Sequence, residues 1–257
     1  MPLQKAIFNR AERMLGTAAL EVLSRARVAL FGLGGVGSWC AESLVRTGVG
    51  RLMLVDADRV AASNVNRQLM ATTKTIGQFK TDALAARLRD INPDVVLDIR
   101  PQIYNAATSA SFDLSEWDYV VDAIDSLDSK ALLIRQALAI PTVTLFASMG
   151  AALKMDPFQI RQSPFDKVSG DGLARALRQK FRKTGGLPGR AFVCVWSPEY
   201  RENLGPADDA DTVPSAENGL PSKARINGTV AHTTAIFGFA LAGLVVDDIV
   251  RRAAALG

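Results

Sequence analysis

The sequence predicts an α/β fold with a doubly wound, mostly parallel sheet and helices on both of its faces. Apolar runs of strand length alternate with segments in which apolar residues recur at helical spacing, a pattern typical of a parallel sheet. The second observation is a glycine-rich turn, Gly32–Gly37, which follows the apolar run 27–31 and opens a helix-like segment over 38–47. This strand, turn and helix predict a Rossmann-like nucleotide-binding core over residues 27–150.

The other strands of this core are expected from runs rich in Val, Ile, Leu and Phe, at residues 51–55, 95–99, 119–123 and 142–146. Before the core, residues 11–24 are expected to form a helix within an N-terminal helical segment, 1–26. A chain of 257 residues with 48% hydrophobic content is large enough to bury one full core. We therefore expect a single domain over 1–257.

After residue 150 the regular alternation ends, and residues 151–257 are expected to form an elaborated substrate-side and C-terminal region. Its expected elements are a strand near 158–161, a basic helix over 173–183 and an apolar helix over 235–246. The stretch 205–225 is rich in Pro, Gly, Asp and Ala and is expected to be a mobile loop.

Cysteine content and the apolar pattern bear on the compartment. Two cysteines, Cys40 and Cys194, cannot form a disulfide framework or a four-cysteine zinc site, so we expect a reducing cytoplasm, no zinc, and small buried side chains at both positions. The start of the chain lacks the pattern of a signal peptide. The apolar run 235–246 is shorter than a membrane span, so no span is expected. The single histidine, His232, is expected to have no catalytic task.

The glycine turn itself predicts a phosphate site. Glycine lets the backbone approach a phosphate closely, and the N-terminus of the following helix offers free N–H groups and a positive dipole. A carboxylate, Asp56, ends the second strand 19 positions after Gly37, which suits the hydroxyls of a ribose. The residues expected to hold the nucleotide on this basis are Gly32, Gly34, Gly35, Gly37 and Asp56.

Nicotinamide oxidoreductases share the same glycine and aspartate pattern, so the residues that follow it must distinguish an oxidoreductase from a protein that binds a nucleotide for another purpose. A second carboxylate, Asp58, is followed by the run Ser63–Gln68, which contains Asn64 and Arg67. Lys80 then opens a helix, and Asp125 follows a later strand. The set supplies two cations for phosphates and a carboxylate able to hold Mg²⁺, which hydride transfer does not require.

In this order and at this spacing, the glycine loop, the Asn-x-x-Arg-Gln element, Lys80 and Asp125 resemble the adenylating enzymes of the ubiquitin-activating and sulfur-carrier-activating superfamily. That resemblance covers roughly residues 8–160. Within the superfamily, the chain is more similar to the tRNA threonylcarbamoyladenosine dehydratases, and this likeness extends through 148–151, 156–157, 167–174 and the final helix. The chain departs from the dehydratase pattern at Ala151–Leu153 and at Gly172.

The resemblance implies ATP-dependent dehydration of threonylcarbamoyladenosine in tRNA to a cyclic oxazolone, through an adenylated carboxylate. It implies that Asn64, Arg67 and Lys80 contact the ATP phosphates, that Asp56 and Asp58 belong to the nucleotide site, and that Asp125 holds Mg²⁺. It also implies that Arg10, in Phe8-Asn9-Arg10, reaches the ATP bound to a partner subunit, which makes a homodimer the catalytic unit. The catalytic residues expected in this way are Arg10, Arg67, Lys80 and Asp125.

A tRNA substrate is expected to leave an electrostatic footprint. The net charge of +4 and pI of about 9.2 are only mildly basic, but residues 175–190 contain six cations and no Asp or Glu. Three of the cations, Arg175, Arg178 and Arg182, fall on one helical face, which predicts a contact with nucleic-acid phosphates. The competing reading of this stretch is a solvated surface.

Other functions stay open at this stage. The nearest alternative is an adenylyltransferase that activates the C-terminus of a sulfur-carrier or ubiquitin-like protein; a nicotinamide oxidoreductase and a non-catalytic nucleotide-binding scaffold are further candidates. The cationic helix and the lack of paired zinc-binding cysteines favour tRNA. A sulfur-relay protein remains a possible partner.

Overall fold

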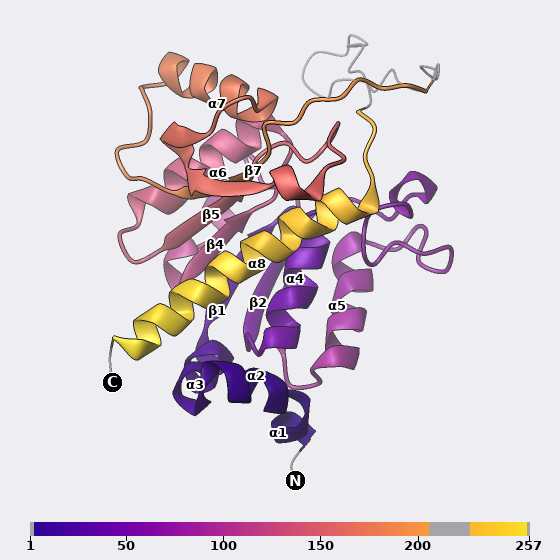
Figure 1. Cartoon of the computed structure of the whole chain (residues 1–257), viewed down its shortest axis with the longest axis vertical. Coiled ribbons are helices and arrows are strands. Elements are labelled where there is room, and N and C mark those ends of the chain that lie inside the picture. The colour runs from indigo at the N-terminus through magenta and orange to yellow at the C-terminus, as the bar shows by residue number, and fades with distance from the viewer. Residues whose placement is uncertain (1–2, 206–226, 256–257) are drawn as a thin grey trace.

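A computed structural model describes residues 3–205 and 227–255, and its centre is a seven-stranded sheet in the order β3-β2-β1-β4-β5-β7-β6 (Figure 1). Neighbouring strands are parallel except for the pair β6–β7 at one edge. The strands are β1 (Arg27–Phe31), β2 (Arg51–Val55), β3 (Val96–Arg100), β4 (Tyr119–Asp122), β5 (Thr144–Ser148), β6 (Arg161–Pro164) and β7 (Val193–Trp196). The predicted fold class, a doubly wound and mostly parallel sheet, is confirmed.

The first two strands lie where the sequence predicts them, β3 and β4 differ from the prediction by one residue, and β7 was not predicted. Strand β5 begins two residues late because Val143 N–H closes a turn onto the carbonyl of Ile140. The strand predicted near 158–161 is wrong: residues 157–159 form a short 3₁₀ turn, in which Asp156 accepts a hydrogen bond from Phe158 N–H and Pro157 occupies the first position. Strand β6 starts only at Arg161.

Helices cover both faces of the sheet. Leu44, Leu84, Phe237 and Leu241 belong to the buried cluster on one face, and Leu133 to the cluster on the other. The helices are α1 (Leu3–Ile7), α2 (Asn9–Leu15), α3 (Thr17–Arg25), α4 (Gly37–Thr47), α5 (Lys80–Ile91), α6 (Leu127–Ala139), α7 (Gly172–Lys183) and α8 (Ala231–Ala254). Helices α3, α4, α5 and α8 contribute to the first cluster, and α6 and α7 to the second.

Two helices differ from the sequence-based expectation. The single helix predicted over 11–24 is broken at Gly16, whose positive φ of 85° ends α2 and begins α3. Helix α8 is twice the expected length, 24 residues, and is long and apolar enough by composition to cross a membrane. In the structure it packs along α4, where a Cβ on Gly238 would lie 2.4 Å from the carbonyl oxygen of Val36. Its apolar face is therefore used inside the protein.

The topology separates two ends of the molecule. Helices α1–α3 lie at the end of the sheet where β1 begins, as Figure 1 shows. The carboxyl ends of β1, β2, β4 and β5 meet at the opposite end, which is where parallel α/β sheets place their ligands. The predicted mobile loop 205–225 lies, apart from Gly205, outside the described residues.

Candidate active site

A cavity of about 600 Å³ lies at the carboxyl ends of the parallel strands. One part of its lining comes from the glycine turn after β1 and from the residues that follow β2. The other part comes from residues 148–152 after β5, together with Leu173, Asn227 and Thr229. Of the residues predicted to bind the nucleotide, those in the lining are Gly32, Gly34, Gly35, Asp56, Asp58, Arg67, Lys80 and Asp125.

Glycine is required at two positions of the turn. Gly32 has a φ of +86°, and a Cβ there would lie 2.6 Å from the carbonyl oxygen of Ala123. At Gly37, which opens α4, a Cβ would lie 1.8 Å from the carbonyl oxygen of Gly32. Gly34 has open space on the cavity side, with the nearest atom, Gln68 Nε2, 3.9 Å from such a Cβ. The turn therefore offers bare backbone to the cavity at the N-terminus of α4, as a phosphate requires.

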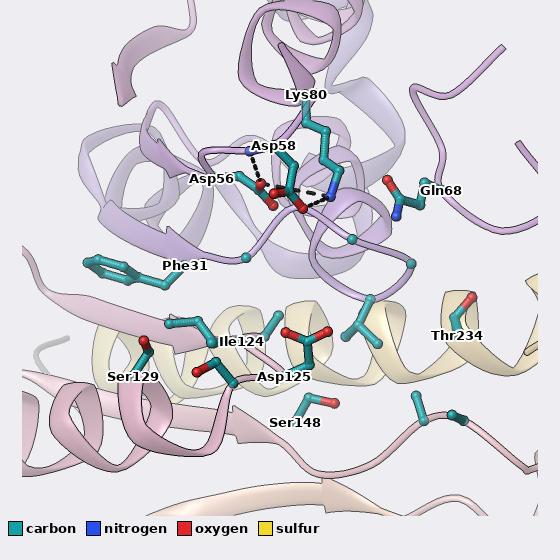
Figure 2. Close-up of a pocket in the computed structure, with 18 of the residues that line it drawn as sticks. Phe31, Asp56, Asp58, Gln68, Lys80, Ile124, Asp125, Ser129, Ser148 and Thr234 are labelled. Carbon is teal, nitrogen blue, oxygen red and sulfur yellow. Dashed lines mark hydrogen bonds and ion pairs between the residues drawn. The ribbon is translucent and has the colours of Figure 1, made fainter. Parts of the chain in front are cut away.

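A charged cluster follows β2, and Figure 2 shows its three side chains pointing toward one another. Asp56 accepts hydrogen bonds from Leu33 N–H at 2.7 Å and Asp58 N–H at 2.9 Å, so its carboxylate is fixed beside the glycine turn. Lys80 Nζ lies 2.6 Å from Asp58 Oδ2 and 3.8 Å from Asp56 Oδ1. Burial raises the pKa of Asp56, and the Lys80 ammonium opposes that shift. The buried ammonium of Lys80 therefore lies beside Asp56, the carboxylate expected to bind the ribose hydroxyls.

Two of the three named residues of the Asn-x-x-Arg-Gln element line the cavity. Asn64 does not line the cavity: its Oδ1 accepts from Ala61 N–H at 3.0 Å and closes the short turn there. Its contact with an ATP phosphate stays a prediction. Arg67 lines the cavity, held by hydrogen bonds from Nη1 to Ser63 O and Asn66 Oδ1. Gln68 was predicted only as part of the motif, yet it also lines the cavity, and its buried Oε1 has no hydrogen-bond partner among the described residues.

Asp125 is placed by a buried ion pair behind it. Lys130 Nζ lies 2.9 Å from Asp122 Oδ2 and donates to the carbonyl of Ile124 at 3.0 Å; both charged side chains are fully buried. Asp122 also accepts from Ile124 N–H. These contacts fix the turn after β4, and Asp125 points from it into the cavity (Figure 2).

The wall after β5 is also fixed by buried charges. Asp171 caps α7 by accepting from Ala174 N–H at 2.9 Å, and its Oδ1 lies 3.5 Å from Gly150 N in the cavity wall. Lys154 Nζ lies 3.7 Å from Asp171 Oδ2 and donates to the carbonyls of Ser197 and Glu199, both at 2.8 Å. Burial lowers the pKa of Lys154, and Asp171 opposes that shift. No signal in the sequence distinguishes Lys154 from a surface lysine.

Arg10 does not reach the cavity of its own chain. It is exposed on α2, and α2 lies at the amino end of the sheet, opposite the cavity (Figure 1). Its role in a partner subunit stays a prediction.

The basic helix α7 departs from the expectation of one cationic face. Arg175 and Arg182 are exposed, but Arg178 turns inward, where its guanidinium donates to the carbonyls of Phe165 and Val168 and stacks over the Phe165 ring. Helical spacing does not reveal this, because the segment that Arg178 contacts precedes the helix. The phosphate-contact prediction therefore narrows to Arg175 and Arg182.

Neither cysteine is placed for nucleophilic chemistry. Cys40 and Cys194 are fully buried, and burial raises the pKa of both thiols. His232 Nε2 lies 2.8 Å from the carbonyl oxygen of Met155, a contact that links α8 to the segment after β5.

Residues 8–252 match the model of the ThiF family. The chain belongs to the ThiF family. It is 36% identical to the tRNA threonylcarbamoyladenosine dehydratase of Bacillus subtilis, over 95% of this chain and 94% of that protein. Among solved structures, it is similar to Escherichia coli tRNA N6-threonylcarbamoyladenosine dehydratase in complex with ATP, with a TM-score of 0.85, 30% identity, and coverage of 98% of this chain and 97% of the other. A relative of another kind, the sulfur carrier protein adenylyltransferase of Thermus thermophilus, is 33% identical over 52% of this chain and 49% of that protein.

The buried pair behind Asp125 yields a stability prediction. Replacing Lys130→Met leaves Asp122 as an uncompensated buried carboxylate, which is expected to cost about 3–5 kcal/mol of unfolding free energy. The matched control is Lys180→Met, because Lys180 forms its ion pair with Asp128 at 2.6 Å near the surface; that change is expected to cost less than about 1 kcal/mol. Urea unfolding of both variants measures the difference, and equal small losses would contradict a positioning role for the buried pair.

Proposed function

We propose that this chain is an ATP-dependent tRNA threonylcarbamoyladenosine dehydratase. The observation that carries the proposal is a single cavity with two differently built ends, a nucleotide end at β1 and β2 and a second wall at residues 148–152. A cavity of this kind suits an enzyme that holds ATP and the carboxylate of a second substrate together. Likeness to the dehydratases along nearly the whole chain supports tRNA-borne threonylcarbamoyladenosine as that second substrate.

The residues present fit ATP. The bare glycine turn and the N-terminus of α4 suit a phosphate, and Asp56 suits the ribose hydroxyls. Arg67 and Lys80 line the same cavity and supply positive charge for the phosphates. In the solved structures the family's dehydratase from Escherichia coli is seen with ATP.

A Mg²⁺ ion is proposed at Asp125. The described residues contain no group of three or more His, Cys, Asp or Glu side chains that could hold a metal. Mg²⁺, however, commonly takes one or two carboxylates and completes its shell with phosphates and water. One exposed carboxylate aimed at the glycine turn fits that mode, and the ion would neutralise charge on the phosphates.

The reaction needs little covalent chemistry from the protein. A carboxylate oxygen of the threonyl group attacks the α-phosphorus, and pyrophosphate leaves. The carbamoyl oxygen then attacks the activated carboxyl carbon, the C–O bond to the phosphate breaks, and AMP departs with the carboxylate oxygen as the ring closes and a proton is lost. Because the nucleophile is part of the same molecule, its effective concentration is high and no cysteine is required. The chain's task is to align the groups and neutralise charge.

The proposal includes a homodimer in which Arg10 of one subunit serves the cavity of the other. A cytoplasmic location and docking of a sulfur-relay protein stay predictions. The alternative activity, activation of a sulfur-carrier protein, is less well supported because that likeness spans only about half of each chain.

Incubation with ATP and tRNA carrying threonylcarbamoyladenosine, followed by mass spectrometry of the nucleosides, tests the proposed dehydration: loss of one water from the modified nucleoside is expected. Retention of that water, with ATP bound, would overturn it.

Asp125→Asn is expected to lower turnover on the order of 10²–10³-fold, because an amide is a poor Mg²⁺ ligand and one electrostatic contact to the phosphates is lost. The change is nearly isosteric, so the fold is retained. The control is Asp128→Asn, three residues along, whose partner Lys180 lies outside the cavity. AMP release at saturating ATP and Mg²⁺ is the measurement, and normal turnover in the Asp125 variant would remove this residue from the mechanism.

Subunit mixing tests Arg10. Arg10→Ala and Lys80→Ala proteins are each expected to be inactive, but a heterodimer of the two contains one site with both residues intact. Statistical exchange in a two-fold dimer predicts recovery of about one quarter of wild-type activity. If exchange is demonstrated by mass and no activity returns, Arg10 does not act in trans.

Arg175 and Arg182 are expected to contact tRNA phosphates, so their replacement by alanine is expected to weaken tRNA binding and lower the salt slope of log affinity by roughly one unit per lost contact. ATP affinity is expected to stay unchanged. The control variant is Arg175→Lys with Arg182→Lys, which keeps the charge. A salt series of binding measurements decides, and identical slopes in all three proteins would show that α7 presents only a solvated surface.

A further inference from the structure

The rim of the cavity on its substrate side is built from three chain segments. Leu153, directly after the wall residues 150–152, donates its N–H to Gly228 O at 3.0 Å, and its carbonyl accepts from Arg201 N–H at 3.0 Å. Gly228 stands between Asn227 and Thr229, which both line the cavity. The segments 153–155 and 199–201 therefore run side by side at the mouth.

Two exposed aromatic side chains lie close in sequence to these joined segments. Phe158 is 95% exposed and Tyr200 is 70% exposed, although most aromatic side chains in the described residues are buried. Glu199 connects their segments, because its Oε2 accepts from Met155 N–H and Asp156 N–H, both at 2.8 Å. Phe158 and Tyr200 each lie within two residues of this contact.

Charged hydrogen bonds join the segments that carry the two rings. Burial disfavours ionisation of Glu199, but hydrogen bonds from Arg201 and from the two backbone N–H groups outweigh it and lower the pKa of Glu199 to about 2. The carboxylate is therefore charged at neutral pH and holds both segments. Beneath it, the buried ammonium of Lys154 binds the carbonyls of Ser197 and Glu199. The rings are displayed from a fixed backbone, which lowers the entropic cost of binding a partner.

The proposed substrate explains what exposed rings at this mouth would meet. The threonylcarbamoyl group is attached to N6 of adenine, on its Watson–Crick edge. For its carboxylate to reach the wall at residues 150–152, the modified adenosine must be unpaired and turned out of its stack. Its neighbours then lie at the rim in a single-stranded segment, with base faces free to stack on aromatic side chains.

We propose that Phe158 and Tyr200 form a stacking platform for the unpaired bases next to the modified adenosine. The inference rests on the proposed function and names the part of the tRNA that the rim receives. An interface between copies of this chain fits the rim less well. Two aromatic side chains bury about 150–250 Å² each, far below the roughly 1,000 Å² of a stable interface. Charged residues also lie beside them in the sequence: Asp156 near Phe158, and Arg201 and Glu202 after Tyr200.

The experiment measures the Kd of tRNA carrying threonylcarbamoyladenosine for Phe158→Ala and Tyr200→Ala. Each is expected to raise Kd roughly 5- to 100-fold, the range for loss of one base–aromatic stack. The salt slope of log affinity is expected to stay at the wild-type value because no phosphate contact is lost. ATP affinity is also expected to stay unchanged.

Conservative and remote variants sharpen the test. Tyr200→Phe keeps the ring and is expected to bind as wild type, whereas Phe158→Leu keeps apolar area without a base-sized flat face and is expected to bind weakly. Val96→Ala, which removes a 57% exposed side chain at the start of β3, is the matched surface control and is expected to have no effect. Thermal melts check that every variant is folded.

Wild-type affinity in both alanine variants would overturn the inference, as would a fall in salt slope or a change in sedimentation coefficient, which would indicate a phosphate contact or a subunit interface instead. Failure of the proposed function is distinguishable, since the wild-type protein would then bind ATP but fail to convert the modified tRNA. Active wild-type protein with unaffected alanine variants would remove the stacking platform alone.

Discussion

The close approach of the glycine turn to the end of β4 is the constraint on which the rest of the site depends. A Cβ on Gly32 would lie 2.6 Å from the carbonyl oxygen of Ala123, so β1 and β4 meet at this point only because the side chain is absent. Directly behind Ala123, the buried Lys130–Asp122 pair fixes the same turn from below. The glycine turn, the N-terminus of α4 and Asp125 are thus placed relative to one another by one contact and one ion pair. Both halves of the proposed ATP site depend on this junction.

Four cationic side chains in or behind the cavity each have a hydrogen-bond or ion-pair partner within the chain. The solvent exposure of that partner distinguishes the cations that can bind a ligand from those that hold the walls. The buried ammonium of Lys80 lies 3.8 Å from the largely buried Asp56, but its nearer partner is Asp58, whose side chain is 70% exposed and can be replaced by an incoming phosphate without burying an unpaired carboxylate. Arg67 is similarly held by Ser63 O and Asn66 Oδ1 at the surface. Lys130 and Lys154 have fully or almost fully buried carboxylate partners. If either lysine bound a ligand instead, its carboxylate would be left buried and unpaired. The first two cations are therefore suited to bind ligand, and the last two to hold the walls.

The sequence predicted the nucleotide half of the fold well because its signals are local. After their first residues, Arg27 and Arg51, the first two strands are uninterrupted apolar runs, and the glycine turn and Asp56 follow them directly. Elsewhere the deciding contacts are remote. Strand β6 is polar and pairs with β7 about thirty residues later, so neither periodicity nor propensity marks it. The inward turn of Arg178 depends on carbonyls of the preceding segment, and Lys154 looks in sequence like any solvated lysine. The fold class and the charged and glycine residues at the nucleotide end of the cavity were predictable, whereas the buried charges that fix the substrate-side wall were not.

That difference follows from how the two halves are assembled. The nucleotide end forms from residues within the span 31–130, largely through consecutive strands and helices. The substrate end joins segments far apart in the chain: Lys154 to Ser197, Glu199 to Met155, and Asn66 Nδ2 to Thr229 O across 163 positions. The entropic cost of closing a loop grows only slowly with its length. A few contacts are therefore enough to hold segments together that lie far apart in the sequence. A substrate wall built in this way can change without disturbing the ATP site. The similarity to the dehydratases covers nearly the whole chain, including the substrate wall, and therefore supports a common substrate. The similarity to the sulfur carrier protein adenylyltransferase covers only half of the chain and supports only the chemistry that the two proteins share.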